Sequence, residues 1–358
     1  MTHDASLHSD ERFARGIRHH EAGELAAAAA LYAELLTQYP HEISLLQRNI
    51  DVLMQLGRNE AVIPSLERLL ELQPANVEAH YLLGMALLNT GRQTAAEARM
   101  RRALEYNPDF FAAHAVLSHI ALPGEHYYHV LDQAHELLRP ATYVEIGVET
   151  GASMKLARPP TRCVGIDPEP RIQFQFNATV RIFAMTSDDF FATRDLRQEL
   201  DGRPVDMAFI DGLHLFEAAL RDFINIERHA TGDTVVFMHD CVPLDRPTSS
   251  RQRQTTFWSG DTWKIIPCLK RYRPDLGILT LAAPPTGLAV VWGLDPGSTV
   301  LGDNMQAILE EFVPLDYGYL GDAKFEMLNV TFDPWPQVLA SIRGGAARGG
   351  SAAPSGTS

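Results

Sequence analysis

The feature that most constrains the fold is a spacing of 34 residues in the first third of the chain. Two series keep this spacing and a fixed offset from each other: the glycines Gly23, Gly57 and Gly91, and the prolines Pro40, Pro74 and Pro108. Glycine permits the left-handed backbone that ends a helix, and proline cannot continue a helix. The spacing therefore predicts three helix pairs, each with a glycine after its first helix and a proline after its second.

Apolar residues keep the same register between the glycines and the prolines. They are Ala28, Val62 and Ala96, then Tyr32, Leu66 and Met100, then Leu35, Leu69 and Ala103. This pattern resembles the tetratricopeptide repeat, which implies an all-α solenoid over residues 9–122. A generic helical bundle is the alternative. Such a solenoid holds a protein or peptide partner on its concave face, while a role limited to packing stays open.

The charge balance excludes one class of function. The chain has 31 Lys and Arg against 45 Asp and Glu, a formal net charge of −14. A general nucleic-acid binder needs a cationic face, so we expect no nucleic-acid partner. The three cysteines are widely spaced and suit a reducing compartment. Because no secretory signal and no apolar stretch of roughly 20 residues is visible, we expect a cytoplasmic protein without membrane contact.

The pattern changes after Leu122, where short apolar runs begin to alternate with helical stretches. The expected strands are 143–148, 162–167, 180–186, 205–211 and 234–240, followed by a hairpin of 277–283 and 287–294. Runs of this kind predict a parallel sheet covered by helices on both faces. We therefore expect an α/β domain over residues 124–296, with a doubly wound, Rossmann-like, seven-stranded sheet that ends in an antiparallel hairpin. A C-terminal extension, 297–342, and a flexible tail, 343–358, follow it.

The first expected strand ends in a glycine-rich turn. Its sequence is Glu145-x-Gly147-x-x-x-Gly151-x-Ser153, and the two glycines permit a tight turn into a helix and a close approach of backbone to ligand. Glu149 stands where the dinucleotide fingerprint needs a glycine. The Glu145 carboxylate would repel a pyrophosphate and attract an ammonium group. On electrostatic grounds the turn favours S-adenosylmethionine over a nicotinamide cofactor.

Further motifs follow the turn in a recognisable order. They are Asp167 at the end of the second strand, Phe209-Ile-Asp211-Gly-x-His214, Arg221-Asp222 and His239-Asp240. Together with the turn they resemble the class I S-adenosylmethionine-dependent methyltransferases over about residues 125–296. The resemblance is nearest to the branch of macrolide-sugar O-methyltransferases and cephalosporin-modifying enzymes.

The resemblance implies a role for each strand end. Cofactor contacts would come from Glu145, Gly147, Gly151, Ser153, Asp167, Thr186, Ser187 and Asp188. Asp211 and Asp240 match the carboxylates that hold a divalent metal, which would activate a substrate hydroxyl and make Asp211 catalytic. His239 is a candidate third ligand and would shift the preference from Mg²⁺ toward Mn²⁺, Fe²⁺ or Zn²⁺. Cys241 departs from the Asn or Asp of the relatives, so the presence of a metal stays open.

Two other features surround this expected site. His214 is a candidate general base, with a bond to Asp211 or to backbone as the alternative. The long segment 242–276 is placed to form a substrate lid, on which Trp258 and Trp263 would stack against the acceptor; the alternative for Trp263 is a place in the core.

The function expected from these residues is O-methylation, dependent on S-adenosylmethionine, of a hydroxyl on a sugar, natural product or other small-molecule acceptor. The alternative is a repeat-containing interaction protein with a degenerate or cofactor-sensing methyltransferase-like domain. An oxygenase-type activity is a third reading, because the cephalosporin-modifying relatives span more than one chemistry.

Overall fold

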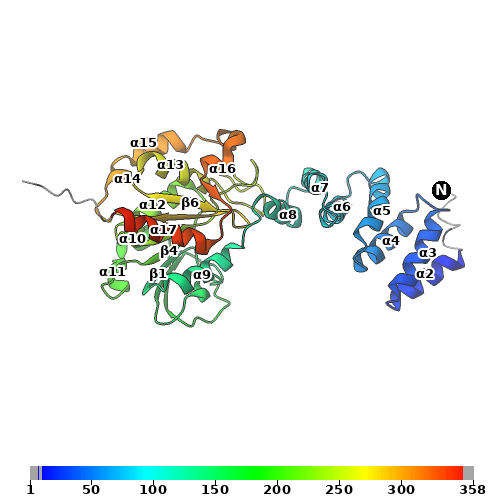
Figure 1. Ribbon diagram of the computed structural model, residues 1–358, viewed down its shortest axis with the longest axis horizontal. Coiled ribbons are helices and arrows are strands. Elements are labelled where there is room, and N and C mark those ends of the chain that lie inside the picture. Colours follow the sequence, from blue (N-terminus) through cyan, green and yellow to red (C-terminus); the bar gives the residue numbers. More distant parts are fainter. Residues whose placement is uncertain (1–6, 8–9, 350–358) are drawn as a thin grey trace, which may run out of the picture. The chain divides into compact units, whose positions relative to one another are not determined.

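The protein is described by a computed structural model that places residue 7 and residues 10–349. The chain divides into two compact units, Met1–Ile120 and Ala121–Ser358. Figure 1 shows helices alone in the first unit and a sheet with helices in the second. None of the helices in the described part of the chain combines the length and the apolar composition that crossing a lipid bilayer demands.

The first unit is a row of helix pairs, as the repeat predicts. Its helices are α2 (Glu11–Glu21), α3 (Leu25–Leu36), α4 (Ile43–Gln55), α5 (Asn59–Leu72), α6 (Val77–Asn89) and α7 (Gln93–Tyr106), followed by α8 (Phe111–Ala121). The repeat glycines Gly23, Gly57 and Gly91 have φ of +75°, +65° and +78° and lie between the two helices of a pair. A Cβ on Gly16 would lie 2.7 Å from the ring of Tyr32, so the absent side chain lets α2 and α3 approach closely.

The second unit is built on one sheet, with strand order β3-β2-β1-β4-β5-β7-β6-β8. The strands are β1 (Thr142–Ile146), β2 (Arg162–Asp167), β3 (Thr179–Ala184), β4 (Met207–Ile210), β5 (Val235–Met238), β6 (Gly277–Leu281), β7 (Leu288–Trp292) and β8 (Val330–Thr331). The first five strands are parallel, and β6 and β7 form the expected antiparallel hairpin. The predicted number of seven strands is wrong, because β8 from the C-terminal extension pairs in parallel with β6.

Helices cover both faces of the sheet. One face packs on α9 (Tyr127–Leu138) and α17 (Trp335–Gly349), which lie side by side. The other face packs on α10 (Ser187–Thr193), α11 (Leu196–Glu199), α12 (Phe216–Glu227), α13 (Ile265–Tyr272), α14 (Val300–Asp303) and α15 (Met305–Phe312). Successive strand residues alternate between the two cores: Tyr143 and Phe209 face α9, while Val144 and Ile210 face the opposite layer.

The extension belongs to this unit. After α15 it forms α16 (Lys324–Met327), then β8 and α17. Trp335 is fully buried, and its ring lies 5.2 Å from that of Phe237 on β5. Helix α17 continues to Gly349, so the predicted flexible tail is helical over 343–349, and the rest of that prediction lies outside the described residues.

Candidate active site

Five strand ends meet at one edge of the sheet. Because β1 to β5 are parallel, the segments that follow them gather at their carboxyl ends, where α/β sheets bind their ligands. These segments contain every residue that the sequence singles out for cofactor or metal binding, apart from Glu145 within β1 and Asp167 at the end of β2.

The glycine turn after β1 packs tightly against the end of β4. Gly147 has φ of +89°, and a Cβ there would lie 1.9 Å from the carbonyl oxygen of Asp211. Its N–H donates to the carbonyl of Ile166 at 2.9 Å. The turn leads into a single 3₁₀ turn, η1 (Met154–Leu156), and not into the full helix that the sequence predicts. Only glycine fits at position 147, and the turn is fixed between two strands.

Glu145 lies beneath this turn and is completely buried. Its carboxyl group accepts hydrogen bonds from the hydroxyls of Tyr143 and Ser153, both at 2.6 Å. Burial raises the pKa of Glu145 to about 8, against the lowering effect of the two hydroxyls. The hydroxyl of Ser153, expected to bind the cofactor's carboxylate, is thus directed at Glu145.

Asp167, at the end of β2, organises the neighbouring loops. One carboxylate oxygen accepts from the N–H of Glu149 at 2.8 Å, and the other accepts from the N–H of Glu169 at 2.7 Å. After β3, Asp188 pairs through both oxygens with Arg221 of α12, each at 2.9 Å. Asp167 and Asp188 therefore lie at the predicted edge, and both already have partners within the protein.

Ser187 begins α10, and Thr186 caps that helix by accepting from the N–H of Asp189 at 3.1 Å. Ser187 also hydrogen-bonds the buried Asp222, whose pKa burial raises to about 6. Asp222 thus lies inside the fold, while its neighbour Arg221 pairs with Asp188.

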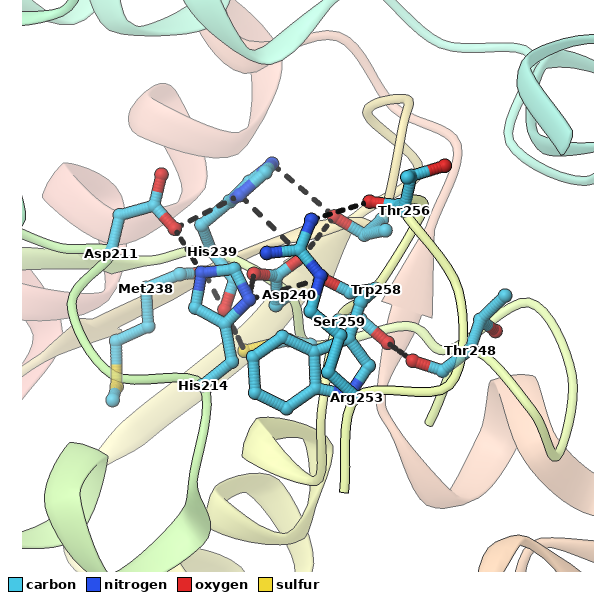
Figure 2. Close-up of polar contacts among 12 residues, drawn as sticks. Asp211, His214, Met238, His239, Asp240, Thr248, Arg253, Thr256, Trp258 and Ser259 are labelled. Atoms are coloured by element: carbon cyan, nitrogen blue, oxygen red, sulfur yellow. Dashed lines mark hydrogen bonds and ion pairs between the residues drawn. The ribbon is translucent and has the colours of Figure 1, made fainter. Parts of the chain in front are cut away.

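Two carboxylates and two imidazoles form a cluster where β4 and β5 end (Figure 2). We call Asp211, His214, His239 and Asp240 the carboxylate–histidine cluster. One ligand atom from each of Asp211, His214 and Asp240 lies within 4.8 Å of the others, an arrangement able to hold a metal ion. His214 Nδ1 lies 3.0 Å from Asp240 Oδ2, and His214 Nε2 lies 3.6 Å from Asp211 Oδ1.

Asp240 is the residue of the cluster best suited to hold a cation. Its backbone has φ of +61°, an uncommon conformation for a residue with a side chain. Its buried Oδ2 lies 3.0 Å from His214 Nδ1, an ion pair that lacks the geometry of a hydrogen bond. The same His214 Nδ1 also hydrogen-bonds to the carbonyl oxygen of Trp258 at 3.1 Å. A buried carboxylate oxygen that forms an ion pair with a histidine fits a divalent cation, which prefers hard oxygen ligands.

The charges of the cluster compensate one another. Burial alone would lower the pKa of His214, but Asp240 and Asp211 raise it well above the ordinary value. Burial would also lower the pKa of His239, but Asp211 and Asp240 raise it above the ordinary value. Burial would raise the pKa of Asp211, yet the two histidines hold it well below its usual range. A protonated His214 is no general base; it can take up that role once a cation neutralises the carboxylates.

His239 occupies a supporting place. Its Nδ1 lies 3.3 Å from Asp211 Oδ1, and its Nε2 lies 3.3 Å from Thr286 Oγ1. Both ring nitrogens of His239 have partners within the protein, and its role as a third metal ligand stays a prediction. Cys241 directs its thiol to the carbonyls of Met238 and His239 and away from the cluster.

Part of the predicted lid forms a wall behind His214. The ring of Trp258 stacks on His214 at 5.2 Å and 22°, and its Nε1 donates to the carbonyl of Ser250 at 2.5 Å. Gly260 has φ of +58°, and a Cβ there would lie 1.8 Å from the carbonyl oxygen of His214. Trp263 is buried in the core, which resolves the alternative left open for it.

A buried carboxylate anchors this wall. Asp261 accepts from the N–H of Phe216 at the start of α12 (2.8 Å), from Arg251 (2.6 Å) and from Lys264 (2.7 Å). Lys264 also donates to the carbonyl of Val313 at 2.9 Å. Since Asp261 and Lys264 are almost fully buried, the segment is fixed to the domain at this point.

Sequence reasoning missed two residues of the site. The ring of Tyr127, at the start of α9, lies 4.1 Å from the ring of His239. Thr286, in the turn between β6 and β7, donates to Asp240 Oδ1 at 2.6 Å. A hydroxyl in the Pro-Pro-Thr-Gly turn was a usable signal, because β6 ends at the same edge as the parallel strands. Nothing in the sequence around Tyr127 pointed to the site.

Comparison with known proteins supports both parts of this description. Residues 144–241 match the sequence model of a methyltransferase domain, and residues 53–120 match that of a tetratricopeptide repeat. A search among curated proteins returned no match. Both matches agree with the two families that the sequence resembles.

Solved structures are similar to this chain over part of its length. MamA from Desulfovibrio magneticus RS-1, residue 41 to the end, has 23% identity and a TM-score of 0.28, covering 30% of this chain and 61% of that one. Another crystal structure of MamA has 25% identity and a TM-score of 0.28, over 29% and 60% of the two chains. The first tetratricopeptide repeat of Spaghetti (RPAP3), bound to an HSP90 peptide, has 18% identity and a TM-score of 0.25, over 28% and 79%. This chain thus spans about three fifths of the length of the MamA structures.

Proposed function

We propose that the second unit is an S-adenosylmethionine-dependent methyltransferase that acts on a hydroxyl of a sugar, natural product or other small molecule. The observation that carries the proposal is the cluster of Asp211, His214 and Asp240, with its two carboxylates, beside the Gly147 turn. The match of residues 144–241 to a methyltransferase domain supports the same reaction class.

Each strand end has a task in this proposal. S-adenosylmethionine, when bound, supplies a methyl group on a good leaving group, so the protein mainly has to position the two reactants. Asp167 would accept hydrogen bonds from ribose hydroxyls, and the turn at Gly147 would receive the methionine end. Ser187 and Asp188 lie where the adenine would be bound.

The carboxylate–histidine cluster would act on the acceptor. Asp211 and Asp240 would hold a divalent cation, whose charge eases the ionisation of a hydroxyl bound to it. His214 would receive the hydroxyl proton, because its pKa falls toward neutrality once the carboxylates are shared with a cation. Trp258, stacked on His214, would keep the ring oriented and shield it from water on that side.

Titration calorimetry with S-adenosylhomocysteine tests the proposal. We expect Asp167→Ala to weaken binding at least about tenfold. The variant loses the carboxylate that would contact the ribose, and this carboxylate also accepts from the N–H groups of Glu149 and Glu169 and so orders their loops. Asp240→Ala should keep cofactor affinity and lose turnover on an acceptor panel. Asp233→Ala removes an exposed carboxylate at the amino end of β5 and serves as the control. Wild-type affinity in Asp167→Ala, or full turnover in Asp240→Ala, would refute these placements.

A specific observation favours the second candidate function, an interaction protein with a cofactor-sensing domain. Ser153 and Asp188 are already bound within the protein, to Glu145 and Arg221. In this candidate the repeats recruit a protein or peptide, and the second unit binds the cofactor without transferring its methyl. Wild-type protein that binds S-adenosylhomocysteine but methylates no member of the acceptor panel would favour it over the enzyme.

A further inference from the structure

The turn between β6 and β7 reaches into the carboxylate–histidine cluster from the antiparallel side of the sheet. The carbonyl of Thr286 accepts from the N–H of Val242 at 2.6 Å. A Cβ on the next residue, Gly287 (φ +75°), would lie 2.4 Å from the Val242 side chain. The turn is therefore fixed against the segment that follows Asp240, and the Thr286 side chain is 3% exposed.

The hydroxyl of Thr286 joins the two carboxylates of the cluster. It donates its single proton to Asp240 Oδ1 at 2.6 Å. Its oxygen therefore accepts from His239 Nε2–H at 3.3 Å, and the opposite ring nitrogen of His239 lies 3.3 Å from Asp211 Oδ1. These contacts form a continuous connection from Asp240 through Thr286 and His239 to Asp211.

We infer that Thr286 is a positioning residue which, with His239, forms a clasp that holds Asp211 and Asp240 at the spacing a divalent cation requires. The inference rests on the proposed function and adds a residue outside the strand ends that the sequence motifs mark. Thr286 contacts neither cation nor substrate in this role, since its hydroxyl is used by Asp240.

The geometry of Asp240 explains why a clasp is needed. Its left-handed backbone costs on the order of 1 kcal/mol and persists only where the surroundings enforce it. One of its oxygens is fixed by Thr286, and the other lies 3.0 Å from His214 Nδ1, within the group of ligand atoms that includes Asp211. Groups that orient metal ligands in this way typically change metal affinity by about 10- to 100-fold when they are removed.

The experiment measures Mn²⁺ binding to the full chain, by the loss of the free-ion paramagnetic resonance signal. Thr286→Val keeps the shape of the side chain and removes the hydroxyl; we expect its Mn²⁺ affinity to fall by about 10- to 100-fold. Thr286→Ser restores the hydroxyl and should bind Mn²⁺ as the wild type does. If Thr286→Val does not fold, Thr286→Ala removes the same hydroxyl and gives the same comparison.

Thr280→Val is the matched control. Thr280 is a fully buried threonine on the adjacent β6, and its hydroxyl donates to the carbonyl of Leu328 at 2.7 Å. Its loss should lower stability and leave Mn²⁺ affinity unchanged. S-adenosylhomocysteine affinity, measured in parallel, should be the same in all variants.

Three results would overturn the clasp: equal Mn²⁺ affinity in Thr286→Val and wild type, an equal loss in Thr280→Val, or wild-type protein that binds S-adenosylhomocysteine and no Mn²⁺. The last result leaves the methyltransferase proposal standing. A wild-type protein that fails to bind S-adenosylhomocysteine contradicts the proposed function itself, whatever its Mn²⁺ affinity.

Discussion

Replacing Glu145 by Gln should change how the stability of the second unit depends on pH. Glu145 is fully buried, its carboxyl group accepts hydrogen bonds from the neutral hydroxyls of Tyr143 and Ser153, and Asp211 and Asp167 disfavour its ionisation further. Burial raises its pKa from 4.5 to about 8 in the folded protein. The glutamine keeps the shape of the side chain and cannot ionise.

The magnitude follows from proton linkage. Between pH 4.5 and pH 8 the folded state retains the Glu145 proton and the unfolded state has lost it. The folded state thus binds more protons, and the free energy of unfolding falls as pH rises through this window, by about 1.4 kcal/mol per pH unit. From pH 5.5 to 7.5 the wild type should lose about 2.7 kcal/mol that Glu145→Gln does not lose.

Urea unfolding followed by tryptophan fluorescence measures this difference. The four tryptophans, Trp258, Trp263, Trp292 and Trp335, all lie in the second unit, so the signal reports that unit alone. Other titrating groups are common to both proteins and cancel in the difference. Glu149→Gln changes an exposed carboxyl in the same turn and should follow the wild type. Parallel pH profiles for wild type and Glu145→Gln would refute the reasoning.

Three further outcomes follow from the packing. Gly147→Ala should destabilise the second unit by more than about 2 kcal/mol and abolish S-adenosylhomocysteine binding, since its Cβ would clash with the Asp211 carbonyl. Gly202 has the same left-handed backbone (φ +80°) but open space around it, so Gly202→Ala should lower the free energy of unfolding by only about 1 kcal/mol. Lys264→Met should cost about 3 kcal/mol by leaving Asp261 short of a buried partner, whereas Arg246→Ala breaks an exposed pair and should leave the urea midpoint unchanged. Burial raises the pKa of all three cysteine thiols. A disulfide reagent should therefore modify none of them quickly in the folded protein and all three in urea. One fast-reacting thiol in the folded protein would contradict this burial.

The sequence predicted the parts of the fold that local pattern determines. The 34-residue register sets helix length and spacing within each repeat, so α2 to α7 follow directly from it. The parallel strands are continuous apolar runs, and their ends were predicted within a few residues, which was enough to bring Asp167, Asp211 and Asp240 to one edge.

The remaining parts depend on contacts between segments far apart in the chain. Strand β8 has two residues and exists only because β6 offers unpaired backbone groups. Both His214 and His239 lie beside the two carboxylates, and the orientation of their rings depends on contacts with Trp258 and Thr286. The turn after β1 yields only a short 3₁₀ segment, η1, which lies against α9.

Because β8 pairs with β6, a chain cut before β8 should not fold as a smaller stable domain. The amides of Thr280 and Ala282 donate to the carbonyls of Asn329 and Thr331, both at 2.9 Å. Without β8, these amides would lie on an exposed sheet edge, where a strand from another molecule could pair with them. Without α17, the apolar site that Trp335 fills beside Phe237 would be empty. Such a fragment should aggregate during expression, because β8 and α17 belong to the same compact unit as the parallel strands.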